Sequence, residues 1–460
     1  MATTPYFVIS PNGILSIIGL LHGPDRTEPT PAEDWRQATV DMVIPALNEE
    51  KNITLCLASI ARQTLRPKRI ILIDDGSRDR TMELARDFCA ANALELIAIH
   101  RREPIGKTPT IKRQSREFDS DVEFILDGDT VLESDNYIER AVEELYKGAG
   151  IASACGTILP LREKDRRVEM DRGPMQRFLT ARPDIELKVE EGLVHRIQRT
   201  ISNLYRDTLY LFLQKFVYHG QMVFFGSITN PVGCAVAYRR KYVQDLFNKY
   251  EPRLGDDLTN SEDIFIGFAL LEKGYRNIQL TDVYARSEEP EVKRLPRQIY
   301  MWSSSFLQSC YYFDALLRSP FKSIKRYRHH KKIEKDRKIQ EKRLIKEPYR
   351  QSFGEQYTLE YGRPMGWVLL ISAFEKISFP TVLTVMLILK LWEPLAITLL
   401  AETLLMVIIL AVVAKGHRLA YIGKGLLITP IRYLSILFDL LTMFRFAFEL
   451  WVSRTRRWRK

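Results

Sequence analysis

Short apolar runs alternate with amphipathic stretches from residue 39 to about residue 158. The runs have the length of buried strands, and several of the stretches between them have helical periodicity. Strands that alternate with helices are typical of a parallel sheet covered by helices, and such a sheet binds ligands at the carboxyl ends of its strands. We therefore expect an α/β fold with a Rossmann-like, mostly parallel sheet in this part of the chain.

Acidic motifs follow two of the expected strands. Asp74 and Asp75 end the run RIILIDD, and Asp127 and Asp129 end the run VEFILDGD. Because the carboxyl ends of parallel strands meet at one edge of a sheet, both pairs should face the same crevice. Such pairs are also common in turns and at helix caps, so Asp75 could merely cap the helix that follows.

A third acidic pair, Glu262 and Asp263, begins the segment SEDIFIGFALLEKGYR. Apolar residues recur at helical spacing behind it, which places Asp263 in the first turn of a helix. The structural alternative is that both carboxylates only complement the positive end of that helix, which stabilises it by about 0.3–1 kcal/mol.

The last hundred residues are far more apolar than the rest of the chain. The segments that begin at Trp367 and Leu395 are long enough to span a bilayer. A third apolar region, from Leu426, carries several charges and could be a third span or an interfacial helix. The positive-inside rule favours two spans, because two keep the basic C-terminus on the cytoplasmic side.

The formal net charge of +11 suits a nucleic-acid binder, a protein that faces anionic lipid, or an enzyme of phosphorylated substrates. Much of the excess lies between Lys322 and Lys346, beside apolar segments, as the positive-inside bias produces. A solvated charged helix is the alternative for this run. The acidic motifs would repel nucleic-acid phosphate, so we expect no nucleic-acid partner. Five widely spaced cysteines indicate neither a disulfide framework nor a zinc site.

The acidic motifs belong to an ordered series that also contains IPALNEE at 44–50, GK at 106–107, VGCAVAYRR at 232–240 and RQIYMW at 297–302. Over residues 41–302 this series resembles the family 2 glycosyltransferases of the GT-A fold, especially the hyaluronan, cellulose and chitin synthases. The more specific parts are the acidic pair eleven residues before Gly274, counted from Asp263, and the Gln298-x-x-x-Trp302 pattern. The resemblance implies a nucleotide-diphosphate sugar as donor, most often a UDP-sugar.

The resemblance also implies roles for named residues, and simple chemistry supports them. A departing diphosphate needs a cation held by carboxylates, here Mg²⁺ or Mn²⁺, and an inverting transfer needs a base for the acceptor hydroxyl. Donor-binding residues would be Pro45, Glu49, Asp74, Asp75, Lys107, Asp127 and Asp129, the metal ligand Asp129, the acceptor-binding residues Glu262, Gln298 and Trp302, and the base Asp263. Lys107 could instead be a solvated lysine, and Trp302 a membrane-interface anchor.

The sequence departs from the family pattern at Met301, where the family has arginine. A charged contact to the diphosphate is therefore missing or comes from Arg297 or another basic residue. Asp256 and Asp257 are rivals of Asp263 for the base, although their spacing to Gly274 is too long.

We expect four parts: an N-terminal amphipathic or packing segment (1–38), a GT-A domain ending in an interfacial helix (39–320), a basic cytoplasmic linker (321–364) and membrane-embedded helices (365–460). Within the GT-A domain, residues 161–192 have no clear period and are interpreted as an insertion or mobile loop. The catalytic domain would face the cytoplasm of an integral membrane protein.

The leading functional hypothesis is a metal-dependent, inverting polysaccharide synthase that extends a polymer at the cytoplasmic face. Its partners would be a nucleotide sugar, a glycan acceptor and membrane lipids, and export would need an oligomer or a partner protein. The alternatives are transfer of one sugar to a lipid acceptor, such as a polyprenyl phosphate or a glycolipid, and a non-enzymatic membrane scaffold.

Overall fold

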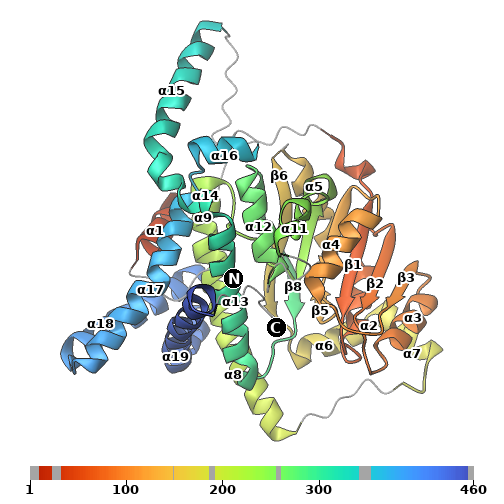
Figure 1. The fold of residues 1–460 in the computed structure, drawn as a ribbon. Coiled ribbons are helices and arrows are strands. Elements are labelled where there is room, and N and C mark those ends of the chain that lie inside the picture. The colour runs from red at the N-terminus through yellow and green to blue at the C-terminus, as the bar shows by residue number, and fades with distance from the viewer. Residues whose placement is uncertain are drawn as a thin grey trace.

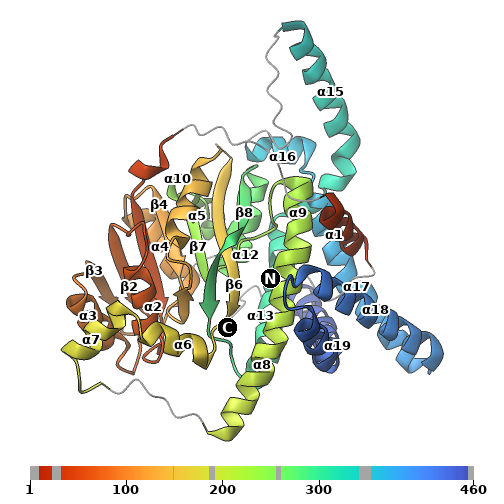
Figure 2. The ribbon, with the colours of Figure 1, turned by 180° about the vertical axis from the view of Figure 1, so that it is seen from behind.

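The computed structural model describes residues 10–22, 33–148, 150–185, 192–254, 259, 261–340 and 354–453. An α/β domain with one sheet lies beside a group of C-terminal helices, and a long helix projects away from both (Figures 1 and 2). The sheet has eight strands in the order β3-β2-β1-β4-β7-β6-β8-β5. The strands are β1 (Val40–Ala46), β2 (Arg69–Asp74), β3 (Leu96–His100), β4 (Val122–Leu126), β5 (Thr130–Leu132), β6 (Ile151–Pro160), β7 (Ala235–Arg239) and β8 (Arg276–Ser287).

Strands β3, β2, β1 and β4 are parallel to one another, which confirms the expected Rossmann-like half of the sheet. The other half is mixed, because β7 pairs antiparallel with both β4 and β6, and β5 pairs antiparallel with β8. Strand β7 follows a long helical segment in the sequence and inserts between two strands that precede it, which the local pattern of residues does not encode.

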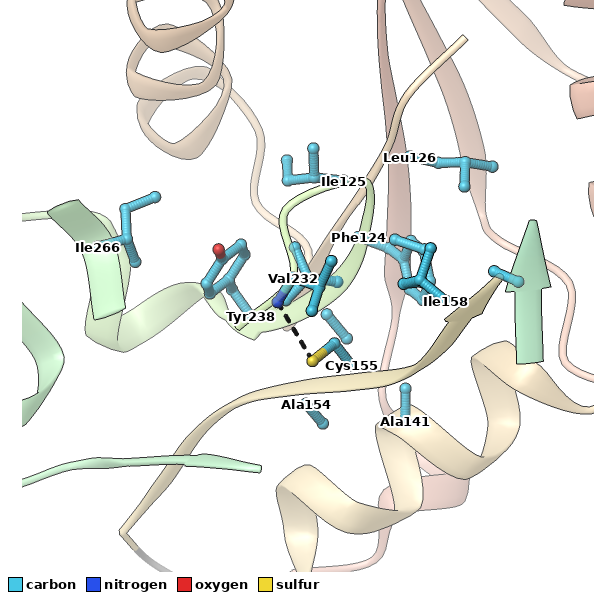
Figure 3. Packing of buried hydrophobic residues seen from close by; sticks show 14 of the residues in the cluster. Phe124, Ile125, Leu126, Ala141, Ala154, Cys155, Ile158, Val232, Tyr238 and Ile266 are labelled. Carbon is cyan, nitrogen blue, oxygen red and sulfur yellow. Dashed lines mark hydrogen bonds between the residues drawn. The ribbon is translucent and has the colours of Figure 1, made fainter. Parts of the chain in front are cut away.

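Helices α2 (Ile53–Ala61), α3 (Thr81–Ala91), α4 (Lys107–Glu117), α5 (Tyr137–Tyr146) and α12 (Glu262–Glu272) pack against the sheet. Figure 3 shows the core where β4, β6 and β7 meet, with Phe124, Ile158 and Tyr238 buried. In this core the backbone N–H of Val232 donates a hydrogen bond of 3.4 Å to Cys155 Sγ. That contact seats the loop before β7 on β6, next to Gly233.

The segment expected to be an insertion or mobile loop is partly helical, so that prediction is wrong over residues 163–181. Helices α6 (Glu163–Met170) and α7 (Gly173–Ala181) form there. The charges are used in pairs, as between Arg62 and Glu169, while Phe178 packs 5.4 Å from the ring of Phe88. Residues 186–191 of the segment lie outside the described part of the chain.

Helices α8 (Leu193–Phe212) and α9 (Tyr218–Phe225), joined by a π-helical turn at Leu213–Val217, form the long helical unit that precedes β7. The N-terminal helix α1 (Pro11–His22) packs against α9, where a Cβ added to Gly19 would lie 2.8 Å from the Cα of Gly220. Helix α1 lies within the N-terminal segment, residues 1–38.

Helix α13 (Leu295–Tyr312) carries the segment expected to be interfacial, and the short helix α14 (Asp314–Leu317) follows it. Its residues Ser303 to Phe306 are buried, and α13 contacts α12 and α19. Helix α15 (Ser323–Gln340) contains much of the basic run and projects away from the body, before α16 (Glu355–Tyr361) (Figure 1). The basic run is thus helical in its described part.

Three C-terminal helices are long and apolar enough to cross a membrane: α17 (Gly366–Ile388), α18 (Trp392–Val413) and α19 (Arg418–Trp451). The third apolar region therefore qualifies as a span by length and composition, where the positive-inside rule favoured two spans. Its charges are paired inside the bundle: Lys376 lies 3.1 Å from Asp439, and Arg432 lies 3.9 Å from Glu402. Pairing of this kind lets ionisable side chains lie within apolar helices.

Candidate active site

The acidic residues that end β2 organise the loops around the carboxyl edge of the sheet. Asp74 Oδ1 accepts a hydrogen bond of 2.9 Å from the N–H of Ser77, and Asp74 Oδ2 lies 2.7 Å from His100 Nδ1. Asp75 accepts from the backbone N–H groups of Ile105 and Gly106, at 3.0 and 2.7 Å. Asp75 therefore shapes the loop before α4 and does not cap α3, whose N-cap residue is Arg80.

Pro45 and Glu49 lie in and just after β1. Pro45 is opposite Ile73 in the parallel ladder, so its position is fixed by the sheet. In the turn that follows, the N–H of Glu49 donates to Thr81 Oγ1 at 2.8 Å. Asn48 has a φ of 57°, a left-handed conformation that asparagine tolerates better than most residues. The turn after β1 is therefore tied to the start of α3.

Four carboxylates gather beside this turn: those of Glu49, Asp127, Asp129 and Glu288. Burial raises the pKa of Asp129 well above its usual value, and the charges of Asp127, Glu49 and Glu288 raise it further. Burial likewise raises the pKa of Glu49 to about 7, with added repulsion from Glu288 and Asp127. A cation would relieve this repulsion, because an opposite charge favours the ionised form.

Glu288 was not among the predicted site residues. It follows directly after β8, its N–H donates to the carbonyl of Asp129 at 3.2 Å, and its Oε2 accepts from Asn52 at 2.6 Å. Asn52 also donates to Glu49 Oε2 at 2.9 Å, so one amide joins the two carboxylates. The available sequence signal was a further acidic pair, Glu288 and Glu289, at the end of an apolar run.

The donor set fits a divalent cation only in part. Carboxylate oxygens suit Mg²⁺ and Mn²⁺, and Asp127 and Asp129 lie on one short turn after β4. Among the described residues, no group of three or more His, Cys, Asp or Glu side chains is placed to hold a metal ion. The protein therefore offers a partial ligand set, to be completed by oxygen atoms of a ligand or water.

Lys107 is an ion-pair hub and not a solvated lysine. Its Nζ lies 2.6 Å from Asp127 Oδ1 and 2.7 Å from Glu262 Oε1, and it donates to the carbonyl of Gly233 at 3.2 Å. Burial lowers the pKa of Lys107, but the charges of Asp127 and Glu262 outweigh burial and leave the pKa well above its usual value. Lys107 thus stays cationic and links β4 to the start of α12.

Asp263 lies in the first turn of α12, as predicted. Its Oδ2 accepts a hydrogen bond of 3.1 Å from the N–H of Gly233, and its Oδ1 accepts one of 2.8 Å from the N–H of Ile264. The side chain is half-buried. The rivals Asp256 and Asp257 lie outside the described residues.

The backbone of Gly233 therefore joins two parts of the site, because its N–H donates to Asp263 and its carbonyl accepts from Lys107. In the sequence analysis, Asp263, Lys107, Asp127 and Glu262 were candidate site residues taken from separate motifs. The structure brings these four together around one glycine.

Gln298 and Trp302 lie on α13 and meet an arginine that the sequence did not single out. Arg206 of α8 donates to Gln298 Oε1, and its guanidinium carbon lies 4.3 Å from the centroid of the Trp302 ring. Arg206 is fully buried and pairs with Glu289 at 3.0 Å. Trp302 is half-buried against the core and Arg206, which disfavours the interpretation as a membrane anchor.

A cavity of about 1180 Å³ is lined by Glu288, one of the four carboxylates. Its other walls come from the start of α2, from α6 and the residues before it, from the first part of α8, and from Lys424 of α19. The cavity therefore extends from Glu288, at the candidate donor site, to Lys424 on the long apolar helix α19.

Residues 41–247 match the family model described as Glycosyl transferase family 2. This match supports the resemblance to family 2 glycosyltransferases that the motifs suggested.

Relatives resemble the chain over short stretches. It is 30% identical over 114 residues to 4,4'-diaponeurosporenoate glycosyltransferase of Staphylococcus haemolyticus, a match that covers 24% of this chain and 30% of that protein. It is 43% identical over 72 residues to a PGL/p-HBAD biosynthesis glycosyltransferase of Mycobacterium bovis, covering 16% and 28% of the two chains. It is 30% identical over 127 residues to undecaprenyl-phosphate 4-deoxy-4-formamido-L-arabinose transferase of Pectobacterium carotovorum, covering 27% and 38%. The chain thus spans under two fifths of the length of these curated relatives.

Among solved structures, the mannosyltransferase PcManGT from Pyrobaculum calidifontis, in complex with GDP-Man and Mn²⁺, has 14% sequence identity to the chain. The TM-score is 0.43, and the superposition covers 91% of this chain and 94% of that one.

Proposed function

We propose that the chain transfers a sugar from a nucleotide-diphosphate sugar, of the UDP-sugar class, to an acceptor at a membrane surface. The observation that carries this proposal is the pair of hydrogen bonds on the backbone of Gly233. Through them the candidate base, Asp263, is fixed relative to Lys107 and hence to Asp127, which lies two residues from Asp129. The match to the family 2 model over residues 41–247 supports the class of reaction.

The proposed mechanism is an inverting transfer. Asp263 takes the proton from the acceptor hydroxyl as its oxygen forms a bond to the anomeric carbon. The bond from that carbon to the diphosphate breaks on the opposite face, and the nucleoside diphosphate leaves with the electron pair. A Mg²⁺ or Mn²⁺ ion bound by Asp129 would neutralise the charge of the diphosphate. Lys107 holds Asp127 and Glu262 in place, and the turn containing Glu49 would contact the nucleoside together with Asp74 and Asp75.

Two acceptors are considered. The motif at Gln298 and Trp302 motivates the prediction that the acceptor is a growing polysaccharide. A lipid acceptor is favoured by the cavity, which extends from Glu288 to Lys424 on an apolar helix. The similarity to undecaprenyl-phosphate 4-deoxy-4-formamido-L-arabinose transferase of Pectobacterium carotovorum supports a lipid carrier as well. We place the catalytic domain on the cytoplasmic face, on the basis of the basic run that α15 carries.

Calorimetric titration of the purified full-length protein with UDP, with and without Mn²⁺, tests the donor site. Metal-dependent UDP binding is expected, and its absence would contradict the proposed function, leaving a scaffold as the better description. Incubation with labelled UDP-sugars and membranes then tests the acceptor. One labelled lipid species is the result expected for a lipid acceptor, whereas a ladder or a high polymer would support polysaccharide synthesis.

A further inference from the structure

The cavity that Glu288 lines is strongly basic. Eight of its eighteen lining residues are lysine or arginine, and three are acidic. The basic residues are Lys51, Arg162, Lys164, Arg166, Arg167, Arg196, Arg199 and Lys424. A concave surface with this excess of positive charge concentrates anions, because its walls focus the field.

Two of the three acidic residues of the cavity are shared between cations, and the third, Glu163, lies 3.7 Å from Arg167. Asp207 pairs with both Arg162 and Lys424, and Glu288 pairs with both Arg166 and Arg199. Each of these two carboxylates is thus shared by two cations. Two carboxylates do not balance four cations, so the inner wall of the cavity has a net positive charge before the rim is counted.

The rim adds further cations. Lys51, Lys164 and Arg196 line the cavity, and none of them forms an ion pair with another of the described residues. Lys164 and Arg196 are exposed. Inside the cavity, Arg166 Nη2 and Asn203 Oδ1 are buried without a hydrogen-bond partner among the described residues, although Arg166 Nη2 lies 3.2 Å from Glu288 Oε2. Buried polar atoms of this kind normally have a partner, so a ligand oxygen and a ligand or water donor would satisfy them.

The cavity adjoins the candidate donor site and has apolar residues near it. Glu288 joins it to Asn52 and the backbone of Asp129. On α8, which carries Arg196 and Arg199 of the cavity, the neighbouring residues Leu193, Val194 and Ile197 are exposed. In Figure 2, α6 and α19 lie on either side of α8, and residues of all three helices line the cavity. A molecule with an anionic group and an apolar chain would meet matching chemistry for both parts.

We propose that this basic cavity binds the phosphate of a phosphate-bearing acceptor and so holds the acceptor next to the donor site. The inference rests on the proposed glycosyl transfer and names the class of acceptor that it uses. Arginine is suited to this task, because its planar group binds phosphate oxygens in pairs. Two sources of phosphate fit the cavity, the headgroup of a lipid such as a polyprenyl phosphate and a water-soluble phosphate ester.

The test is a binding measurement on the full-length protein in detergent, with a fluorescent short-chain polyprenyl phosphate as the probe. The corresponding polyprenol, which lacks the phosphate, and phenyl phosphate serve as competitors. The double variant Arg196→Glu/Lys164→Glu removes two rim cations that hold no carboxylate of the donor site. Its matched control, Arg328→Ala/Lys331→Ala, changes two exposed basic residues on α15.

We expect the probe to bind the wild type and the control alike, and the dissociation constant of Arg196→Glu/Lys164→Glu to rise at least tenfold. Displacement by phenyl phosphate at concentrations similar to those of the probe would identify a soluble phosphate ester as the acceptor. Failure of phenyl phosphate to compete, while polyprenyl phosphate does, would identify a lipid phosphate. Equal competition by polyprenol, or an unchanged dissociation constant in the double variant, would overturn the proposal.

UDP titration of the same samples separates this inference from the proposed function. If UDP binds in the presence of Mn²⁺ and the phosphate probe does not bind, the acceptor class is wrong while glycosyl transfer stands. If UDP does not bind either, the proposed function fails first.

Discussion

The backbone N–H of Gly233 donates a hydrogen bond of 3.1 Å to Asp263 Oδ2, and the two residues are in close contact. A Cβ added to Gly233 would lie 2.7 Å from the Cβ of Asp263 and 2.9 Å from its Cγ. We expect Gly233→Ala to displace the carboxylate and to lower turnover by about a hundredfold, as a small misplacement of a reacting group can. Transfer from labelled UDP-sugar measures this.

The control for that variant is Gly192→Ala, because an added Cβ there has no atom within 4 Å. Unchanged turnover in Gly233→Ala, with a normal melting temperature, would mean that Asp263 need not occupy its present position.

Asp263→Asn distinguishes a general base from a residue that only complements the helix. The amide keeps the shape of the side chain and loses its basicity, so we expect turnover to fall by about a hundredfold or more. UDP affinity, measured by calorimetry, should stay near that of the wild type. Glu139→Gln is the matched variant, because Glu139 is a first-turn carboxylate of α5. It should lower the stability of the protein and leave turnover unchanged. If both variants retain turnover, attention passes to Asp257.

Asp129→Asn tests the metal site. Loss of one carboxylate should abolish Mn²⁺-dependent transfer, because the amide cannot supply the charge that holds the cation. Without metal, the variant should melt no lower than the wild type, since burial and three neighbouring carboxylates make the charge of Asp129 costly. Transfer at several Mn²⁺ concentrations and thermal melts measure both effects, with the exposed Asp171→Asn as control. Full activity at ordinary Mn²⁺ would place the metal elsewhere.

Arg206 and Glu289 form a buried pair whose partners should be separable by mutation. Arg206→Met leaves Glu289 buried without its cation and should lower the free energy of unfolding by about 3–5 kcal/mol. The double variant Arg206→Met/Glu289→Gln removes both charges and should recover most of this loss. Arg297→Met, at the exposed residue that the sequence had offered as the motif's cation, should have little effect. Denaturant unfolding of these proteins and of the single variant Glu289→Gln measures the coupling, and additive effects would contradict it.

Glu123 gives the fold a pH dependence away from the site. It is buried on β4, its side-chain oxygens have no hydrogen-bond partner among the described residues, and burial raises its pKa from 4.5 to about 8, while Arg240 lowers it and Asp41 raises it. Between these two pKa values the folded chain holds a proton that the unfolded chain has lost. The free energy of unfolding therefore falls as the pH rises through this range.

We expect Glu123→Gln to raise the melting temperature at pH 8, because it removes the free-energy cost of burying an ionised carboxylate. The rise should be about 2–4 °C for each kcal/mol of that cost, with little effect at pH 5. The exposed Glu103→Gln is the control, and melts at both pH values measure the difference. An equal effect at the two pH values would show that the charge of Glu123 is not the cause.

The sequence by itself determined the elements and the order of the motifs. Periodicity predicted a mostly parallel sheet, the helix that begins at Glu262 and the apolar C-terminal segments, because each depends on residues close together in the chain. It also placed Asp74, Asp127 and Asp263 at element ends, where side chains of a site are found.

Only the tertiary structure decided which of these residues meet. The insertion of β7 between β4 and β6, the backbone of Gly233 between Asp263 and Lys107, and the packing of Arg206 on Trp302 join residues far apart in the sequence. The basic cavity likewise combines side chains of α2, α6, α8 and α19. Such contacts depend on how whole elements pack, and packing is set by buried surface and charge pairing across the fold, which no local pattern of residues records.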